Sequence, residues 1–332
     1  MTWKILITDY VWPNNDIERC ILETAGADVI IAPDNTEETL TKLVCDCDAI
    51  LTCFAKITDK VIRAATKCVV IGRFGVGVDN IDVKTASELG IAVTYVPDYC
   101  VNEVSDHVVA MMLTWNRKIA VFNNSVKKHG WDSLPLNMRI MRLTDKKLGI
   151  IGFGRIGKAV ADKALSFGLH ILVYDPNIPE YQSDSEKIRQ VSLEELLATS
   201  DFITLHTPAT NETKNLIDKR ELNKMKKDSF LINCSRGSLI NESALYDALK
   251  NESIGGAGID VMVDPIPSRN HPFFKLDNII ITPHTAFFSQ ESTEELQKRA
   301  STEVVSVMNG IMPENLFNEE VLNHPNPRHS IK

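Results

Sequence analysis

Blocks of apolar residues alternate with amphipathic stretches through the first hundred residues. Short apolar runs typical of buried strands occur at residues 5–8, 28–31, 49–52, 68–71 and 92–95. Amphipathic stretches typical of helices occur at residues 16–24 and 36–44. Strands that alternate with helices favour a parallel sheet covered by helices on both faces. The pattern therefore predicts a small α/β domain.

The pattern changes at residues 102–121, where apolar residues recur at helical spacing and Asn102 is a candidate N-cap. We expect one helix there, long enough to link two domains. Strand-like runs then return at residues 148–151, 171–174, 202–205, 230–233, 258–261 and 279–281. A long amphipathic helix is predicted at residues 290–308, and the polar, Pro-rich end NHPNPRHSIK is predicted to fray. The fold class is α/β, with two doubly wound parallel-sheet domains.

Length, charge and cysteine usage restrict the class of protein. A chain of 332 residues favours two domains, and a net charge of -8 with interleaved signs provides no basic surface for nucleic acid. The seven scattered cysteines lack CxxC spacing, so we expect reduced thiols and no metal site; Cys45 and Cys47 fit alternation near a strand better than a ligand pair. With no signal-like N-terminus and no long apolar run, we expect a cytoplasmic protein without a membrane partner.

A glycine motif opens the second series of strands. Gly152, Gly154 and Gly157 form GxGxxG between a strand-like run and a helix-like run. These glycines permit a tight turn, close approach of a pyrophosphate and close helix packing. The next strand ends in Asp175, which can hold ribose hydroxyls and would repel a 2′-phosphate. The motif predicts NAD rather than NADP, and Arg155 is either a pyrophosphate contact or a solvated loop residue.

Two further residues follow predicted strands. Arg236 lies before Gly237 in NCSRGSLINESAL, and a helix capped near Asn241 is predicted after it. A guanidinium can clamp a carboxylate with two hydrogen bonds. His284 lies in IITPHTAFF, and an imidazole can move a proton near neutral pH. Since ligands bind beyond the carboxyl ends of parallel strands, the pair predicts a site for hydride transfer to a keto acid. His107 and His129 are interpreted as polar residues of a helix or loop.

As an ordered set, these motifs resemble the D-isomer-specific 2-hydroxyacid dehydrogenases, especially the branch similar to C-terminal-binding proteins. GRFGVGVDNID, VPDYCVNEVSDH, LHTPAT, GAGIDV and TPHTAFFSQES extend the resemblance over nearly the whole chain. The resemblance implies a flavodoxin-like substrate-binding domain made of residues 1–102 and 289–332. It also implies a Rossmann-type NAD-binding domain at residues 103–288, with the reaction in the cleft between the two.

The resemblance also implies roles for individual residues. Catalysis is carried over to Arg236, His284 and, less directly, Asp264. Cofactor binding is carried over to Gly152, Gly154, Arg155, Ile156, Gly157, Asp175, His206, Thr207, Pro208, Cys234, Ser235, Arg236, Asp260 and His284. Substrate binding is carried over to Gly75, Val76, Gly77, Arg236, Phe54 and Tyr99, although Phe54 and Tyr99 are equally compatible with core packing.

The chain departs from the family at the acid that orients the histidine. The family usually has a glutamate before a proline, five residues after the position of Asp260, whereas this chain has Pro265 there and Asp264 one residue earlier. A carboxylate near the imidazole favours its protonated form. Asp264 either replaces the glutamate or is simply a residue of the Asp-Pro turn.

Three functions remain open on this basis. The leading hypothesis is an NAD-dependent D-2-hydroxyacid dehydrogenase that acts mainly as a 2-keto acid reductase. The alternative is an NAD(H)-responsive scaffold of the C-terminal-binding-protein type, and the weakest is a formate dehydrogenase. The family is typically homodimeric through the cofactor domain, and the apolar-rich segment at residues 121–141 is the candidate contact.

Overall fold

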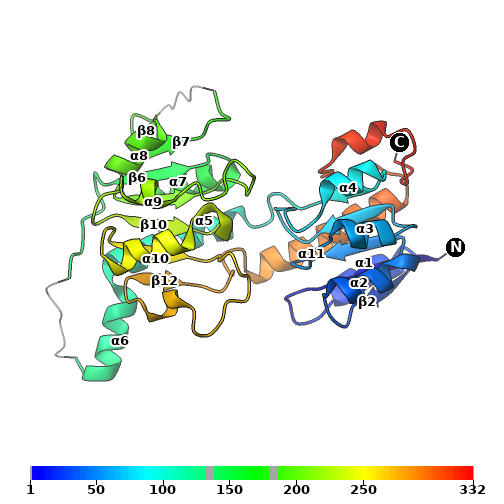
Figure 1. Cartoon of the computed structure of the whole chain (residues 1–332), viewed down its shortest axis with the longest axis horizontal. Coiled ribbons are helices and arrows are strands. Elements are labelled where there is room, and N and C mark those ends of the chain that lie inside the picture. The colour runs from blue at the N-terminus through cyan, green and yellow to red at the C-terminus, as the bar shows by residue number, and fades with distance from the viewer. Residues whose placement is uncertain (1, 132–137, 180–184, 332) are drawn as a thin grey trace. The chain divides into compact units, whose positions relative to one another are not determined.

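The chain folds into two compact units. The computed structural model describes residues 2–131, 138–179 and 185–331. Unit 1 comprises Met1–Tyr99 with Ser289–Lys332, and unit 2 comprises Cys100–Phe288 (Figure 1).

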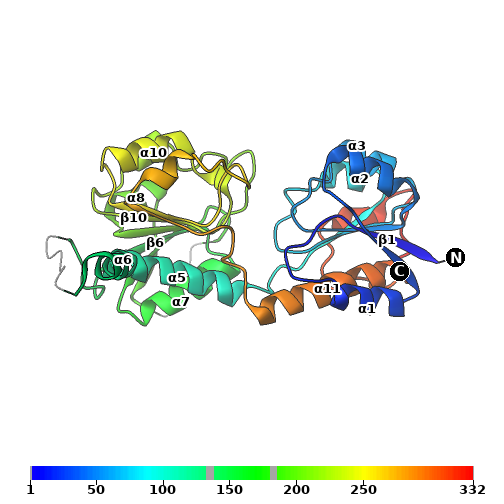
Figure 2. The ribbon, with the colours of Figure 1, turned by 90° about the horizontal axis from the view of Figure 1, so that it is seen from below.

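Unit 1 is built on a five-stranded parallel sheet. Its order is β2-β1-β3-β4-β5, the order of flavodoxin-like folds. The strands are β1 (Trp3–Ile7), β2 (Ala27–Ile31), β3 (Ala49–Thr52), β4 (Val70–Arg73) and β5 (Ala92–Thr94). The helices are α1 (Asp16–Thr24), α2 (Glu37–Leu43), α3 (Asp59–Ala64), α4 (Val83–Glu88) and α11 (Gln290–Met308). Figure 2 shows α1 and α11 on one face of this sheet and α2 and α3 on the other.

A close contact joins α11 to the sheet of unit 1. An added Cβ at Gly72 of β4 would lie 2.6 Å from Val304 Cγ2 of α11. Only glycine leaves room for the helix to approach the strand this closely. The contact anchors a segment from the end of the chain on the sheet that its first hundred residues form.

Unit 1 also buries an acid, Glu18 of α1, whose exposed fraction is 0%. Burial raises the pKa of Glu18 to about 7, whereas an unfolded glutamate titrates near ~4.3. Between these values the folded state keeps a proton that the unfolded state releases, so stability falls as pH rises through this window.

We therefore expect Glu18→Gln to stabilise unit 1 at pH 8 by about 2 kcal/mol and to have little effect at pH 4.5, because glutamine cannot ionise. Thermal unfolding of both proteins at the two pH values measures the difference. The exposed Glu319 provides the control Glu319→Gln. An equal effect of Glu18→Gln at both pH values would contradict the prediction.

Unit 2 is built on a seven-stranded parallel sheet of order β12-β11-β10-β9-β6-β7-β8. The strands are β6 (Lys147–Ile151), β7 (His170–Tyr174), β8 (Ile188–Gln190), β9 (Phe202–Leu205), β10 (Phe230–Asn233), β11 (Gly256–Ile259) and β12 (Ile279–Ile281). The helices are α5 (Val101–Arg117), α6 (Ile119–His129), α7 (Arg155–Leu165), α8 (Leu193–Thr199), α9 (Lys219–Leu222) and α10 (Glu242–Lys250). The strand order reverses between β6 and β9, which is the topological switch point where such folds bind dinucleotides.

The two parallel sheets confirm the predicted fold class. The predicted helices at residues 16–24 and 290–308 have the observed bounds, and Asn241 caps α10 by accepting the N–H of Ala244 at 3.2 Å. None of the described helices combines the length and apolar character that crossing a bilayer requires.

The prediction of a single helix at residues 102–121 was wrong. The chain forms α5 and α6 instead, because Lys118 adopts a left-handed backbone with φ 55°. Its amine lies 3.3 Å from the centre of the Trp115 ring, a cation–π contact that holds the break in place. Asn102 lies inside α5 rather than at its N-cap, which is Cys100.

The prediction that the C-terminal end frays was also wrong. The backbone N–H of Arg328 donates to the carbonyl of Gly90 at 2.9 Å, and its guanidinium donates to the carbonyl of Ala65 at 2.7 Å. His329 is buried and contacts the carbonyl of Val321 at 3.3 Å. The polar residues of this segment pair with backbone carbonyls of unit 1, which low hydrophobicity alone does not reveal.

Candidate functional site

The glycine motif forms the turn between β6 and α7. Gly152 has a left-handed φ of 91°, and an added Cβ there would lie 2.5 Å from the carbonyl oxygen of His206. An added Cβ at Gly157 would lie 2.4 Å from the carbonyl oxygen of Gly152. Both positions therefore require glycine, the first for its backbone conformation and the second for close packing of α7.

Gly154 differs from the other two glycines because an added Cβ there meets nothing within 4 Å. It is the N-cap of α7, and among the described side chains none caps this helix or adds an acid to its first turn. The first N–H groups of α7 thus face open space with the positive end of the helix dipole, which fits a pyrophosphate. Arg155 is exposed and Ile156 is half-buried beside this opening.

Asp175 lies immediately after β7 and fastens the glycine turn. Its Oδ2 accepts the backbone N–H of Phe153 at 2.8 Å, and its Oδ1 accepts that of Asn177 at 2.9 Å. A carboxylate offers about four lone-pair positions, so both oxygens can still accept from ribose hydroxyls. The geometry fits the role carried over to Asp175.

Two neutral side chains lie at the carboxyl ends of β9 and β10. Burial lowers the pKa of His206 to about 3, and its Nδ1 is buried without a hydrogen-bond partner among the described residues. Burial also raises the pKa of the Cys234 thiol well above its usual value. Both groups are therefore uncharged at neutral pH. Thr207, Pro208 and Ser235, to which the resemblance also carries cofactor binding over, lie on the same two loops. The Ser235 hydroxyl donates to the carbonyl of Leu205 at 2.7 Å.

Arg236 follows β10 in a turn that the loop after β11 packs against. An added Cβ at the neighbouring Gly237 would lie 2.1 Å from the carbonyl carbon of Met262. The carbonyl of Arg236 accepts from the Asn233 side chain at 2.9 Å, and its guanidinium donates to the carbonyl of Ser235 at 2.8 Å. The backbone of Arg236 is thus fixed independently of its side chain, which is half-buried.

His284 follows β12 on a strained loop. Its φ is 55°, in the left-handed region, and its backbone N–H donates to the carbonyl of Asp260 at 2.8 Å. The ring of Phe287 meets the imidazole edge-on with a centroid distance of 6.1 Å. Arg236 and His284 therefore both lie at the carboxyl edge of the sheet that carries the glycine turn.

Asp260 holds the loop that carries His284. Its buried carboxylate accepts the backbone N–H groups of Thr285 at 2.9 Å and Ala286 at 3.0 Å, and the hydroxyl of Thr282 at 2.5 Å. The resemblance carries cofactor binding over to this residue. The observed contacts are those of a cap on the following turn.

Asp264 lies on an exposed turn. Its carboxylate accepts the backbone N–H of Ile266 at 3.0 Å, two residues later. This is the local contact of an Asp-Pro turn residue.

The residues carried over to substrate binding in unit 1 are Gly75, Val76, Gly77, Phe54 and Tyr99. Gly75 has a φ of 144°, and an added Cβ would lie 2.2 Å from Nη1 of Arg73. Arg73 is buried, and its guanidinium carbon lies 5.8 Å from the centre of the Phe54 ring. Val76 and Gly77 are half-buried, and Tyr99 is buried.

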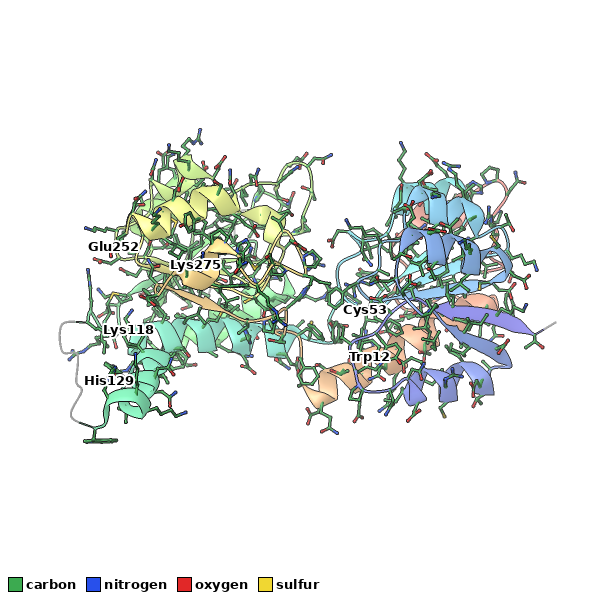
Figure 3. All side chains as sticks on the ribbon, turned by 60° about the horizontal axis from the view of Figure 1, so that its bottom comes forward. Trp12, Cys53, Lys118, His129, Glu252 and Lys275 are labelled. Atoms are coloured by element: carbon green, nitrogen blue, oxygen red, sulfur yellow. The ribbon has the colours of Figure 1, made fainter. Side chains whose placement is uncertain are left out.

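Sequence reasoning missed Asp9, which fixes the loop after β3 in unit 1. Its carboxylate accepts the N–H groups of Cys53, Phe54 and Ala55 at 2.9, 2.6 and 3.1 Å. Cys53 is labelled in Figure 3. An acid directly after β1 was the available signal, since loops at that edge bind ligands.

His107 is a polar residue of helix α5, as the sequence predicts, and its Nε2 lies 3.0 Å from the hydroxyl oxygen of Thr282. His129, at the end of α6, is exposed as expected (Figure 3). In the part of the chain that the structure describes, no group of three or more His, Cys, Asp or Glu residues could hold a metal ion.

Comparison with known proteins places these features in a family context. A family model described as D-isomer specific 2-hydroxyacid dehydrogenase, NAD binding domain, matches residues 109–286. D-3-phosphoglycerate dehydrogenase of Methanocaldococcus jannaschii is 40% identical over 95% of this chain and 59% of its own length. Glyoxylate reductase of Korarchaeum cryptofilum is 36% identical over 86% of this chain and 87% of its own length.

A solved structure is similar over nearly the whole chain. D-lactate dehydrogenase from Aquifex aeolicus, complexed with NAD and lactic acid, is 28% identical, with a TM-score of 0.86 over 94% of this chain and 98% of that one. The chain spans only 50% to 59% of three D-3-phosphoglycerate dehydrogenases that it matches.

Proposed function

Because this chain belongs to the D-isomer-specific 2-hydroxyacid dehydrogenase family, we propose that it is an NAD-dependent reductase of a small 2-keto acid. The family match confirms the resemblance that the sequence motifs indicate, and it covers an NAD-binding domain. The observation that carries the proposal is the position of Arg236 and His284. Both lie at the carboxyl edge of the unit 2 sheet, the edge at which β6 leads into the glycine turn. The product is the D-2-hydroxy acid.

The proposed reaction needs a hydride at carbon and a proton at oxygen. Bound NADH supplies the hydride to the keto carbon, and the electron pair of the C=O π bond moves to the oxygen. The His284 imidazolium donates a proton to that oxygen, and the neutral imidazole remains. Arg236 holds the substrate carboxylate with two parallel hydrogen bonds and so orients the keto group.

The cofactor would be held by the glycine turn and the loops beside it. The free N–H groups of α7 would bind the pyrophosphate, and Asp175 would accept from the ribose hydroxyls. The uncharged His206 and Cys234 would leave the nicotinamide without a competing charge. We propose that the enzyme prefers NADH over NADPH, since the Asp175 carboxylate would repel a 2′-phosphate.

We propose that residues of unit 1 contribute to substrate binding. In the turn of Gly75, Val76 and Gly77, the N–H of Gly75 donates to the carbonyl of Arg73 at 2.9 Å, so the N–H groups of Val76 and Gly77 would bind the substrate carboxylate. Phe54 and Tyr99 would contact the substrate side chain. Asp264 remains our candidate for the acid that orients His284, since a carboxylate that accepts the N–H of Ile266 through one oxygen can accept a further hydrogen bond.

The proposal is tested by following NADH oxidation by the purified protein with glyoxylate, pyruvate, hydroxypyruvate and bulkier 2-keto acids. We expect turnover with at least one of these acids, a D-configured product and a slower reaction with NADPH. A protein that binds NADH but turns over none of them would contradict the proposal.

One observation favours a second function. Pro265 stands where the family usually has the glutamate that orients the histidine, and this departure would suit an NAD(H)-responsive scaffold with little turnover. Such a protein would bind NADH tightly and bind a peptide partner only in its presence. Retention of both Arg236 and His284 favours the enzyme, since sensing of the cofactor requires neither.

We further propose a homodimer that forms through α6. This helix projects from the body of unit 2 (Figure 1), and none of its residues is buried. Ile119, the first residue of α6, is 55% exposed, and Trp131, which follows the helix, is 85% exposed. Large exposed apolar surface marks sites of protein–protein interaction. Residues 132–137 of the predicted contact lie outside the described residues.

We expect the double variant Ile119→Lys, Trp131→Lys to shift the protein from twice the chain mass to the chain mass, because two lysines cannot be buried unpaired at an interface. Light scattering after gel filtration measures the mass. Phe167→Lys, at an exposed position after α7, is the control. A monomeric wild type, or a dimer that survives both substitutions, would exclude this interface.

The seven cysteines are all free thiols in the structure. Free thiols are typical of reducing compartments, so we propose that the protein acts in the cytoplasm. Cell fractionation with antibody detection would test this location.

A further inference from the structure

Three side chains from separate elements of unit 2 meet behind the loop of His284. His107 lies on α5, Asp260 follows β11 and Thr282 follows β12. His107 Nε2 lies 3.0 Å from Thr282 Oγ1, and Thr282 Oγ1 lies 2.5 Å from Asp260 Oδ1. His107 Nε2 also lies 3.8 Å from the same carboxylate oxygen.

The direction of these hydrogen bonds follows from the chemistry of the groups. An ionised carboxylate can only accept, so the Thr282 hydroxyl donates its single proton to Asp260. The hydroxyl oxygen can then only accept from His107, which requires the proton of the neutral ring on Nε2. The contact therefore selects one tautomer of His107 and one rotamer of Thr282.

The chain of contacts ends on the backbone around His284. Asp260 accepts the N–H groups of Thr285 and Ala286, the two residues that follow the histidine. The left-handed conformation of His284 is strained and persists only where the surroundings enforce it. The buried carboxylate is such a constraint, and its orientation depends on Thr282.

We propose that His107 is a positioning residue for the reaction: through Thr282 it orients the Asp260 carboxylate, which holds His284 in the left-handed conformation where its imidazole faces the substrate. The inference rests on the proposed role of His284 as the proton donor. His107 itself touches neither substrate nor reacting atoms in this scheme.

The alternative is that His107 only stabilises α5 against the loop. The two roles differ in what a substitution changes. A structural role would lower the unfolding temperature and leave the turnover of the folded protein intact. A positioning role lowers kcat while the affinity for NADH and the KM for the keto acid stay nearly constant, because binding groups elsewhere are unaffected.

The test compares His107→Leu with His107→Gln, whose amide nitrogen can replace the Nε2 donor. We expect kcat to fall about 10- to 100-fold in His107→Leu, the range for a displaced catalytic group, and to recover most of the loss in His107→Gln. Thr282→Val should lower kcat by a similar factor, and the double variant with His107→Leu should add little, because both break one chain of contacts. His170→Leu, at the amino end of β7 and so at the opposite edge of the sheet from the site, is the matched control.

A second measurement does not depend on turnover. Amide hydrogen exchange of the full chain should show the N–H groups of Thr285 and Ala286 exchanging about 10-fold faster in His107→Leu than in His170→Leu. Unchanged exchange, additive effects in the double variant, or a kcat equal to wild type would each overturn the inference. An inactive wild type whose exchange still responds to His107→Leu would instead overturn the proposed function and leave the positioning contact supported.

Discussion

His284→Asn is expected to lower kcat for keto-acid reduction by about 10²- to 10⁴-fold, the usual contribution of a positioned general acid. Asparagine is the informative replacement because it tolerates the left-handed backbone that His284 adopts, φ 55°. Its amide can still donate a hydrogen bond to the keto oxygen but cannot transfer the proton. Alanine would add backbone strain to the loss of the imidazole.

Steady-state rates over a range of pH, together with NADH binding followed by fluorescence, would measure this effect. The affinity for NADH should stay within a few-fold of wild type, since the glycine turn and Asp175 are untouched. His170→Asn, at the amino end of β7, serves as the control, and a variant His284→Asn with near wild-type kcat would assign the proton to another group.

The sequence pattern predicts the strands well where the residues are bulky and apolar, and poorly where packing requires small residues. Strand β11 begins at Gly256, two residues before the predicted run. An added Cβ at Gly256 would lie 2.5 Å from the ring of Trp115 on α5, so glycine is required there by a helix 140 residues away in the chain. Such a contact leaves no local hydrophobic signal.

The candidate site residues divide into those that follow a strand and those whose contacts are distant in the chain. Arg236 and His284 were predictable because each follows a strand, and the edge of a parallel sheet gathers such residues in one place. His107 was not, because its role depends on a contact with Thr282, which lies 175 residues later. The turn contact of Asp264 was one of two alternatives that the sequence left open, and the hydrogen bond to Ile266 favours it.

Arg236→Ala is expected to lower kcat/KM for the keto acid by about 10²- to 10⁴-fold, because two hydrogen bonds to a charged carboxylate are worth about 1.5–3 kcal/mol each. The fold should tolerate the change. The backbone of Arg236 is extended, and its carbonyl accepts from Asn233 and from the N–H of Leu239 whatever the side chain is. Unfolding temperature and NADH affinity should therefore stay close to those of wild type.

Arg236→Lys separates charge from geometry at the same position. Lysine keeps the positive charge but loses the planar fork, so kcat/KM should fall to a value between those of wild type and Arg236→Ala. Added guanidinium ion should partly restore the Arg236→Ala rate and leave the lysine variant unchanged, because only the alanine variant has room for the ion. Arg220→Ala, at an exposed position on α9, controls for loss of positive charge on unit 2. Equal rates for Arg236→Lys and wild type would mean that Arg236 acts as a point charge and does not clamp the carboxylate.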